Sequence, residues 1–521
     1  MERIVTQASY ASDAAEAEPR PRRIVDLKVQ FRERLATIIS SCWSAAVPFG
    51  PRRKTTRGYS SAGGGLGAAP EGAGDVPSRR STVAQVLNLA WPVVIEQMLG
   101  MAVGLVNTYI VGHLGAAPLA AVGLSTQLSN LMVALFSAVG VGSTALVARH
   151  VGAGERDEAE RIAGQSLLLA MAVGLIAAVP CLVWGRWLLT VLGGAADVVA
   201  LGRTYLLAVG TTMPLMAILF IGNATLRGAG DTRTPMAVMA AVNVTNVLVS
   251  WNLVRGVGPL PALGVTGAGI GAAAGVGVGG LIVATILLRG RSTAGLGVTS
   301  RALRLHPGRV RRLLRIGLPS GIEQVLMRLA QLALVAIVAE LGTAAYAGHQ
   351  LGIQMLSVAF MPGFAFSVAA TTLVGQEMGR QAPRRAESCV YTASGIAAAL
   401  MCSIGVVAFL LAEPLLRVFT SDAEVIAQGL YAVRGCALVE LSLAAYFVFA
   451  GALRGAGDTR FVLLAQVTAI SLVRLPLAYR LGLTFGLGLT GVWVAIVLDM
   501  TARATMLTLR FRRGAWKWIR V

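Results

Sequence analysis

Long apolar stretches dominate the chain from about residue 85 to about residue 510, and short polar segments separate them. A helix needs about 20 apolar residues to cross about 30 Å of hydrocarbon. Twelve stretches reach this length, so we expect an all-α membrane protein with twelve transmembrane helices. The predicted spans cover approximately residues 85–112, 118–146, 162–185, 198–222, 235–255, 262–288, 311–339, 345–372, 388–412, 424–450, 461–482 and 487–509.

The second six stretches repeat the first six at an offset of 227 residues. The phrase LRGAGDTR starts at Leu226 and again at Leu453, and 453 − 226 = 227. The same offset relates the IEQ motif that starts at Ile95 to the one that starts at Ile322. An internal duplication of this length predicts two structurally related bundles of six helices.

Composition supports this assignment and excludes a soluble protein. Apolar residues make up 55% of the chain, charged residues make up 13%, and the mean hydropathy is +0.69. A soluble domain of this composition would leave far too much apolar surface in water. The predicted organisation is an extension, a first lobe, a linker, a second lobe and a tail, over residues 1–80, 81–290, 291–310, 311–510 and 511–521.

Positive charge is distributed unevenly between the loops, within a net charge of +20. The even-numbered connections are rich in arginine, beginning with Arg149, Arg156 and Arg161, whereas the connection over residues 113–117 has none. Because Lys and Arg concentrate in cytoplasmic loops, we expect both termini and both LRGAGDTR loops on the cytoplasmic side of a plasma membrane, the inner membrane of a bacterium. Six helices per copy then give two parallel repeats about an axis along the membrane normal. The charge therefore predicts orientation, not binding to nucleic acid.

Residues 1–80 differ in composition from the rest of the chain. Residues 48–80 are rich in Pro, Gly, Ser and Arg without hydrophobic periodicity, which is typical of a flexible segment. Residues 24–43 can form one basic amphipathic helix on the cytoplasmic leaflet. We expect a flexible, basic cytoplasmic extension that is dispensable.

Two glutamates occupy equivalent positions inside predicted spans. Glu96 and Glu323 follow Pro92 and Pro319, respectively, by about one turn. An ionised side chain at the centre of a bilayer costs about 2.5–3.5 kcal/mol on insertion scales. A glutamate removed from water is suited to take up a proton on one side and release it on the other. Alternatively, it hydrogen-bonds backbone groups that the proline leaves free, and the sequence leaves both interpretations open.

The other polar residues inside the spans differ between the two copies. Asn107 lies eleven residues after Glu96, about three turns of helix, so the two side chains face the same way. Its counterpart in the second copy is the apolar Leu334. We therefore expect two unlike polar sites, one in each lobe. The first contains Glu96, Asn107, Asn243 and Asn246, and the second contains Glu323, Arg328, Gln331 and Glu440.

The repeated phrase LRGAGDTR joins span four to span five and span ten to span eleven. Its glycines permit positive φ, and its aspartate can cap the following helix. A tight structural turn explains these features, and so does a rigid hinge that moves as its helix pair tilts. The hinge or structural residues are Pro92, Gly228 and Asp231 in the first copy and Pro319, Gly455 and Asp458 in the second.

Several of these features together resemble the multidrug and toxic compound extrusion (MATE) family. They are the openings LNLAWPVVIEQ and LRIGLPSGIEQ, the sequence VGHLGAAPLAAVG after span one, and LRGAGDT after spans four and ten. The resemblance covers about residues 81–515 and implies two pseudo-symmetric bundles around a central cleft, with drug efflux driven by inward H⁺ or Na⁺. Similar transporters carry acidic residues where this chain has Asn107, Ser250 and Met327, so the resemblance does not identify the coupling residue.

These observations predict an antiporter that exports amphipathic, often cationic molecules by alternating access, with no cofactor beyond its coupling ion. A carboxylate without nearby oxygen ligands favours H⁺, whereas Na⁺ would need several such ligands. The chain has no metalloprotease or nucleophile-elbow motif, so we do not expect an enzyme. A flippase for a lipid-linked precursor is the alternative, although its cleft would need more basic residues than Arg328. We expect a monomer whose partners are small molecules and membrane lipids.

Overall fold

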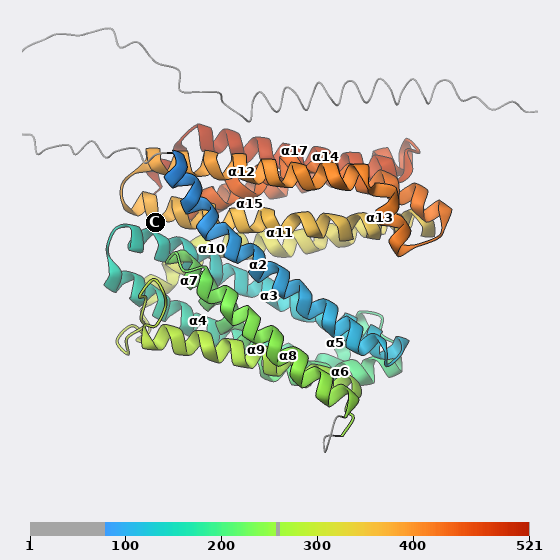
Figure 1. Ribbon diagram of the computed structural model, residues 1–521, viewed down its shortest axis with the longest axis horizontal. Coiled ribbons are helices and arrows are strands. Elements are labelled where there is room, and N and C mark those ends of the chain that lie inside the picture. The colour runs from blue at the N-terminus through green and yellow to red at the C-terminus, as the bar shows by residue number, and fades with distance from the viewer. Residues whose placement is uncertain (1–78, 257–260, 520–521) are drawn as a thin grey trace, which may run out of the picture. The chain divides into compact units, whose positions relative to one another are not determined.

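The computed structural model describes residues 79–256 and 261–519, and the regular elements in this part are all helices (Figure 1). The predictions made for residues 1–78 lie outside the described residues. The first copy of the repeat forms α2 (Arg79–Gly112), α3 (Ala116–Gly152), α4 (Arg156–Val183), α5 (Gly185–Val191), α6 (Ala196–Thr211), α7 (Met213–Gly228), α8 (Arg233–Arg255) and α9 (Gly264–Arg289).

The second copy forms the corresponding set of helices. It contains α10 (Pro307–Ala339), α11 (Thr343–Gly379), α12 (Pro383–Leu410), α13 (Ala412–Phe419), α14 (Ala423–Gly455), α15 (Thr459–Ala469), α16 (Leu475–Tyr479) and α17 (Gly488–Arg512). Two π-helical turns, η1 (Ile470–Arg474) and η2 (Arg480–Thr484), flank α16, and the 3₁₀ turn η3 (Ala515–Trp518) follows α17.

Twelve membrane spans are present in the described residues, as the sequence predicts. Eleven are helices long and apolar enough to cross a bilayer, and the twelfth is the pair α6 and α7, which bends by 56°. Pro214 stands in the first turn of α7, and proline can begin a helix but cannot continue one without losing a hydrogen bond. Its counterpart in the second copy is Leu441, and α14 runs unbroken through that position. Span four is therefore bent, whereas span ten is continuous.

Span eleven is also irregular, but here the second copy is irregular and the first copy is regular. It runs over Thr459–Thr484 and contains both π-helical turns. Pro476 lies between them, where it has no N–H to donate and its ring crowds the preceding turn. An extra residue in the adjacent turns accommodates that defect. The equivalent helix in the first copy, α8, has Val249 at this position and is regular.

The two lobes meet at the end of the bundle where α3 and α11 finish. We call this the arginine-rich end, because it carries Arg149, Arg156, Arg380 and Arg385. A Cβ atom on Gly152 would lie 2.0 Å from the Gln376 carbonyl oxygen, so backbone packs directly on backbone here. From that end the lobes diverge toward the end that carries α5 and α13 (Figure 1).

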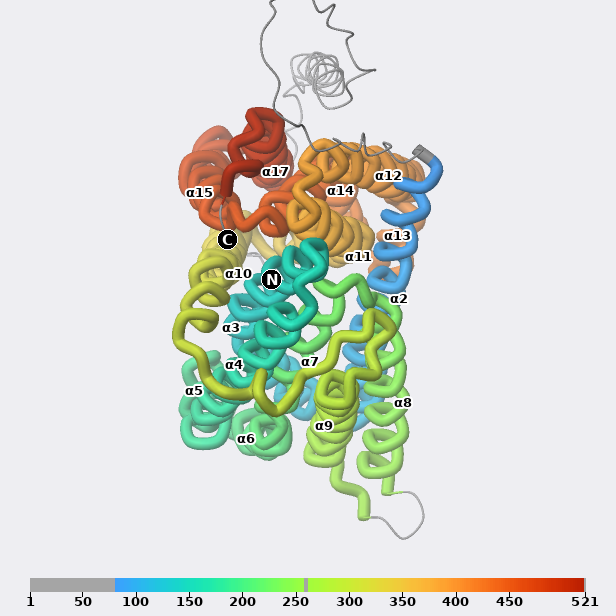
Figure 2. The backbone as a smooth tube through the Cα atoms, turned by 90° about the vertical axis from the view of Figure 1, so that its left-hand side faces the viewer, coloured from blue at the N-terminus to red at the C-terminus, as the bar shows by residue number. Residues whose placement is uncertain are grey.

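The first turns of α2 and α10 are exchanged between the lobes. Val86 and Ala90 of α2 belong to the hydrophobic core of the second lobe. Leu313 and Ile316 of α10 belong to the core of the first lobe. Figure 2, viewed toward the arginine-rich end, shows the start of α2 beside α12. Each helix enters its own lobe near its internal proline, Pro92 or Pro319.

The segment between α9 and α10 packs against the first lobe. Leu296, Val298 and Ala302 are buried in the core of that lobe. The Gln165 side chain donates to the carbonyl oxygens of Ala302 (3.0 Å) and Arg304 (2.8 Å). The linker predicted over residues 291–310 is thus a structural part of the first lobe.

Candidate functional site

A cavity of about 290 Å³ lies between the two lobes. Residues of α3 and α7 form one wall, and residues of α10, α11, α14 and α17 form the other. Its lining is Ser137, Gly140, Val141, Thr144, Phe220, Ala224, Arg227, Ser320, Glu323, Gln324, Met327, Phe360, Phe364, Ser367, Val368, Thr371, Tyr446, Phe447, Arg454 and Met500. Its residues on α3 stand about two to four turns from the arginine-rich end of that helix.

The two walls of the cavity contain residues that are equivalent in the two copies of the repeat. Thr144 and Thr371 are 227 residues apart, and so are Phe220 and Phe447. The two threonines also make equivalent hydrogen bonds, because Thr144 Oγ1 donates to the Ala224 carbonyl (2.8 Å) and Thr371 Oγ1 to the equivalent Gly451 carbonyl (2.9 Å). The cavity is therefore a central one, shared by the two lobes.

Two repeat-related ion pairs connect the duplicated motifs. Arg227 Nη2 lies 2.6 Å from Glu96 Oε1, and Arg454 Nη2 lies 2.7 Å from Glu323 Oε1. Each arginine comes from LRGAGDTR and each glutamate from IEQ. The four side chains are between 5% and 17% exposed, so the pairs are largely shielded from solvent. The repeated phrase thus supplies the counter-charge for the repeated buried glutamate.

Sequence reasoning missed this pairing, because it treated the glutamates as lone carboxylates and the arginines as loop charges. The signal that could have revealed the pairing is that the glutamate motif and the arginine motif are both repeated at the same offset. The second pair also has an additional partner, since the Tyr446 hydroxyl donates to Glu323 Oε1 at 3.3 Å. The first-copy counterpart of Tyr446 is Leu219, which cannot donate.

The glycines of the repeated phrase have two different roles. Gly230 and Gly457 take positive φ values of 94° and 91°, as the predicted turn requires. Gly228 and Gly455 are still helical, and a Cβ atom on either would lie less than 3 Å from the backbone of Thr144 or Thr371. They permit close helix packing, whereas the prediction assigned positive φ to both glycines.

The two aspartates of the repeated phrase also differ. Asp231 accepts hydrogen bonds from the backbone N–H groups of Thr234 and Thr293, each at 2.9 Å. Asp458 makes no such cap and instead accepts from Arg510 Nε at 2.8 Å. The predicted capping role therefore applies to the first copy.

The lobes are joined at the arginine-rich end by bonds that have no symmetric counterpart. Thr372 Oγ1 of α11 donates to the Arg227 carbonyl at 2.9 Å, and Gln376 Nε2 lies 3.4 Å from the Gly228 carbonyl. The first-copy counterpart of Thr372 is Ala145. On that side, Arg149 Nη1 instead donates to the Ile519 carbonyl at 3.2 Å.

Apart from Glu96, which pairs with Arg227, the predicted first-lobe site is a group of buried neutral side chains. Gly100 of α2 faces Met239 of α8, and the two helices cross the bilayer in the same direction. Seven residues further along, Asn107 and Asn246 therefore lie at about the same depth. Asn107 Oδ1 and both polar atoms of Asn246 are buried and have no hydrogen-bond partner in residues 79–256 and 261–519. Asn243 is less available, since its Nδ2 donates to the Met239 carbonyl.

The interior of the second lobe contains a charged network instead. Asp499 Oδ2 lies 2.9 Å from Arg474 Nε and 2.7 Å from Arg503 Nη2. Arg503 Nη1 also donates to Gln466 Oε1 at 2.6 Å and contacts Met327 Sδ at 3.4 Å. The sequence gave no sign that Asp499 has two arginine partners. Met327 lines the central cavity, so the network lies directly behind its wall.

Glu440 is buried in the second lobe without an ion pair. It is 2% exposed, and its Oε2 atom has no hydrogen-bond partner among the described residues. Its Cγ atom would lie 2.8 Å from a Cβ atom on Gly405, so it faces α12. Glu440 lies one turn after Cys436 on α14. It is not part of the lining of the central cavity.

The structure does not bring the remaining two predicted residues to Glu323. Arg328 is exposed and Gln331 is partly exposed, whereas Glu323 is buried. Five residues along a helix correspond to a rotation of about 140°, so Arg328 faces a different side of α10.

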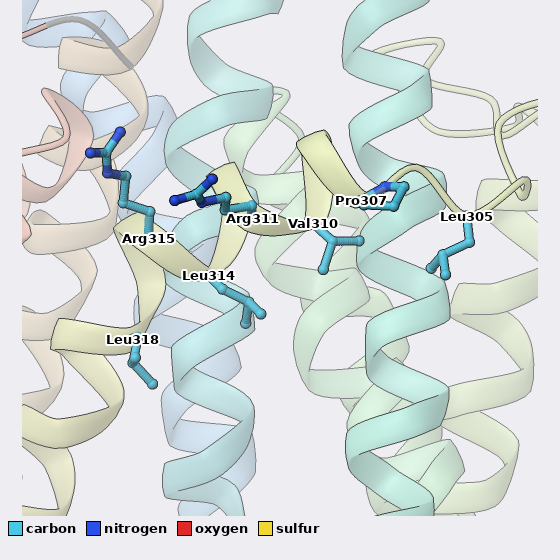
Figure 3. A pocket seen from close by; sticks show the side chains of 7 residues that line it. All are labelled: Leu305, Pro307, Val310, Arg311, Leu314, Arg315 and Leu318. Atoms are coloured by element: carbon cyan, nitrogen blue, oxygen red, sulfur yellow. The ribbon is translucent and has the colours of Figure 1, made fainter.

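A second hollow, of about 460 Å³, lies on the outer side of the first turns of α10. Figure 3 shows its lining, which comes from this helix and the residues just before it. Leu305, Leu314 and Leu318 alternate there with Arg311 and Arg315. This mixture is typical of a helix face at the boundary between hydrocarbon and lipid headgroups. Because one helix forms it, it offers no route between the lobes.

Comparisons with known proteins agree with this architecture. The MatE family model matches residues 92–252 and 319–480, one match in each copy of the repeat. The probable multidrug resistance protein NorM of Thermotoga maritima is 31% identical, over 85% of this chain and 94% of its own length. The multidrug resistance protein PmpM of Pseudomonas aeruginosa is 26% identical, over 85% of this chain and 93% of its own length.

A solved structure has the same fold. The bent form of the Vibrio cholerae MATE transporter VcmN superimposes with a TM-score of 0.76 at 22% identity, covering 84% of this chain and 98% of that one. Two duplicated six-helix lobes, a cavity between them and a family match in each copy lead to one conclusion. The chain belongs to the MATE family of multidrug and toxic compound extrusion transporters.

Proposed function

We propose that the protein exports amphipathic small molecules across a bacterial inner membrane by alternating access of its two lobes, in exchange for inward H⁺. The observation that carries this proposal is the central cavity, whose walls come from both lobes and are related by the repeat. A site between two rocking bundles can face either side in turn. The names of the multidrug resistance relatives support export of drug-like molecules.

The arginine-rich end is the cytoplasmic end in this proposal, with both termini inside, because Lys and Arg concentrate in cytoplasmic loops. The lobes pack backbone to backbone there, through Gly152 and Gly379. The arrangement then corresponds to a state closed to the cytoplasm. Export requires this contact to separate while the opposite ends of the lobes come together.

Pro92 and Pro319 are the proposed hinges for that motion. Each lies where α2 or α10 passes from the core of one lobe into the other. A proline removes one helical hydrogen bond and so lowers the cost of bending at that point.

Glu440 is the proposed proton carrier. Glu96, Glu323 and Asp499 are also buried carboxylates of the spans, but each has an arginine partner. An unpaired ionised carboxylate is costly in a low-dielectric interior, and a proton removes that cost. Cys402 and Cys436 are the titratable groups near enough to sense its charge. Glu323 remains a second candidate, because it lines the cavity.

The function is tested by measuring efflux as dye uptake into everted membrane vesicles, because their cytoplasmic face points outward. Transport should stop when the pH gradient is collapsed and continue when the Na⁺ gradient is collapsed. Glu440→Gln should abolish pH-driven efflux, while Glu413→Gln, which alters an exposed carboxylate of the same lobe, should leave it unchanged. Efflux that follows the Na⁺ gradient would refute H⁺ coupling. Full pH-driven efflux by Glu440→Gln would exclude this residue as the carrier, and Glu323→Gln would then be compared.

A further inference from the structure

The two arginines of the central cavity suggest what kind of molecule binds there. We propose that this cavity holds the carboxylate of an aromatic acid between Arg227 and Arg454. This inference rests on the proposed export function and names the substrate class of the same site.

Fixed positive charge reaches the cavity from both lobes. Arg227 of α7 and Arg454 of α14 both line it, at symmetric positions. Each uses an Nη2 group on its glutamate, and the Nε atom of each is buried from solvent. A guanidinium group carries five N–H donors, so the other Nη groups of both arginines remain as donors for a ligand. An oxygen anion between them would contact both lobes at once.

Negative charge on the described lining is limited to Glu323. That carboxylate is already paired with Arg454 at 2.7 Å and accepts from Tyr446. Glu96 lies behind Arg227 and is absent from the lining. Asp499 lies behind Met327 and pairs with two arginines, Arg474 and Arg503, so this network carries a net positive charge. A cation in the cavity would therefore have no free carboxylate to approach.

The remaining lining favours a flat aromatic body. Phe220 and Phe447 face the cavity from opposite lobes, and Phe360 and Phe364 add two more rings from α11. Aromatic side chains pack well against planar ligands in offset or edge-to-face arrangements. The volume, about 290 Å³, is near the lower limit for small-molecule pockets. A compact aromatic acid fits the size, the rings and the charge together.

Binding of two dyes to the purified full chain in detergent tests the inference. Fluorescein and rhodamine 6G share a xanthene ring system, but fluorescein carries a carboxylate whereas rhodamine 6G is an esterified cation. Fluorescence anisotropy should show fluorescein binding at least about tenfold more tightly. The anisotropy of each dye in protein-free micelles is subtracted, which removes partitioning into micelles.

Variants locate the binding in the cavity. Glu323→Gln should free Arg454 and strengthen fluorescein binding several-fold, while leaving rhodamine 6G binding the same or weaker. The matched control is Glu158→Gln, which frees Arg309 of an ion pair outside the cavity and should change neither affinity. Arg454→Lys keeps the charge but removes the planar fork, and it should weaken fluorescein binding without unfolding the protein.

Equal or tighter binding of rhodamine 6G would overturn the inference, and so would an effect of Glu323→Gln no larger than that of Glu158→Gln. The proposed function fails separately. Selective fluorescein binding without export of either dye from vesicles would leave the binding inference standing and refute transport. Proton-driven export of rhodamine 6G that cavity variants leave unchanged would support transport and refute the binding inference.

Discussion

The two lobes bury different polar groups at comparable places. In the first lobe, α9 carries glycines at Gly271, Gly275 and Gly279 that bring it against α8, and the buried polar side chains of α8 are uncharged. In the second lobe, α17 carries Asp499 and Arg503 on the corresponding face. In the first copy, α9 therefore packs through close backbone contacts, whereas in the second copy α17 packs through an ion-pair network.

The alignment of the copies makes this difference specific. Thr266 and Thr490 are counterparts, so the offset in the last span is 224 residues. Asp499 then replaces Gly275, and Arg503 replaces Gly279. A duplicated fold tolerates this divergence because these positions contact residues of their own lobe, Asp499 and Arg503 in the second and Gly275 and Gly279 in the first. The symmetric features, the Glu–Arg pairs and the cavity walls, lie where the two lobes meet.

The largest expected effect comes from breaking the charged network. Asp499→Asn leaves Arg474 and Arg503 buried without a counter-charge, and loss of one partner from a buried pair costs about 3–5 kcal/mol. We expect a large drop in the melting temperature of the detergent-solubilised protein. Asn246→Leu, the first-lobe comparison, should be close to neutral, because it removes an amide that has no protein partner. Equal effects of the two substitutions would contradict the contrast between the lobes.

Proline exchange tests the second difference, the bend in span four. Leu441→Pro places a proline inside the continuous helix α14 and should cost about 3 kcal/mol or more. Pro214→Leu lies in the first turn of α7, where proline is tolerated, and should cost much less. Thermal unfolding followed by circular dichroism measures both. The comparison fails if α14 accepts the proline without loss of stability.

The smallest expected effect concerns the asymmetric contact at the arginine-rich end. Thr372→Val removes one hydrogen bond to the Arg227 carbonyl and should shift the balance between the two lobe arrangements by about 1 kcal/mol. Thr372→Ser, which keeps the hydroxyl, serves as the control. Cysteine accessibility from the cytoplasmic side reports the change, which should appear in the Thr372→Val variant alone.

Much of the fold follows from the sequence. Twelve apolar stretches and the 227-residue offset predict the spans and the two lobes, because these features depend on length and hydropathy. The bend in span four depends on one residue, Pro214, and the hydropathy pattern passes through it without a break. The exchange of first turns between α2 and α10 has no sequence signature, because apolar residues look alike whichever lobe they pack against.

The site was less predictable, because its contacts join residues far apart in the chain. Glu96 and Arg227 are 131 residues apart, and Arg474 and its partner Asp499 lie on different spans. Arg328 was assigned to the same site as Glu323, but its position five residues later turns it to another face of α10. Glu440 was identified correctly as a buried ionisable residue, since its place in an apolar stretch is visible in the sequence.

The exchanged first turns of α2 and α10 have a consequence for the assembly of shorter chains. A chain of one copy alone would lack the helical segment that completes its core. It would also expose the apolar surface that this segment of the other copy covers. Two such half-length chains can each lend the missing segment to the other, as in domain swapping. A single-copy version of this protein is therefore expected to be an obligate homodimer, and joining the copies in one polypeptide makes that pairing independent of concentration.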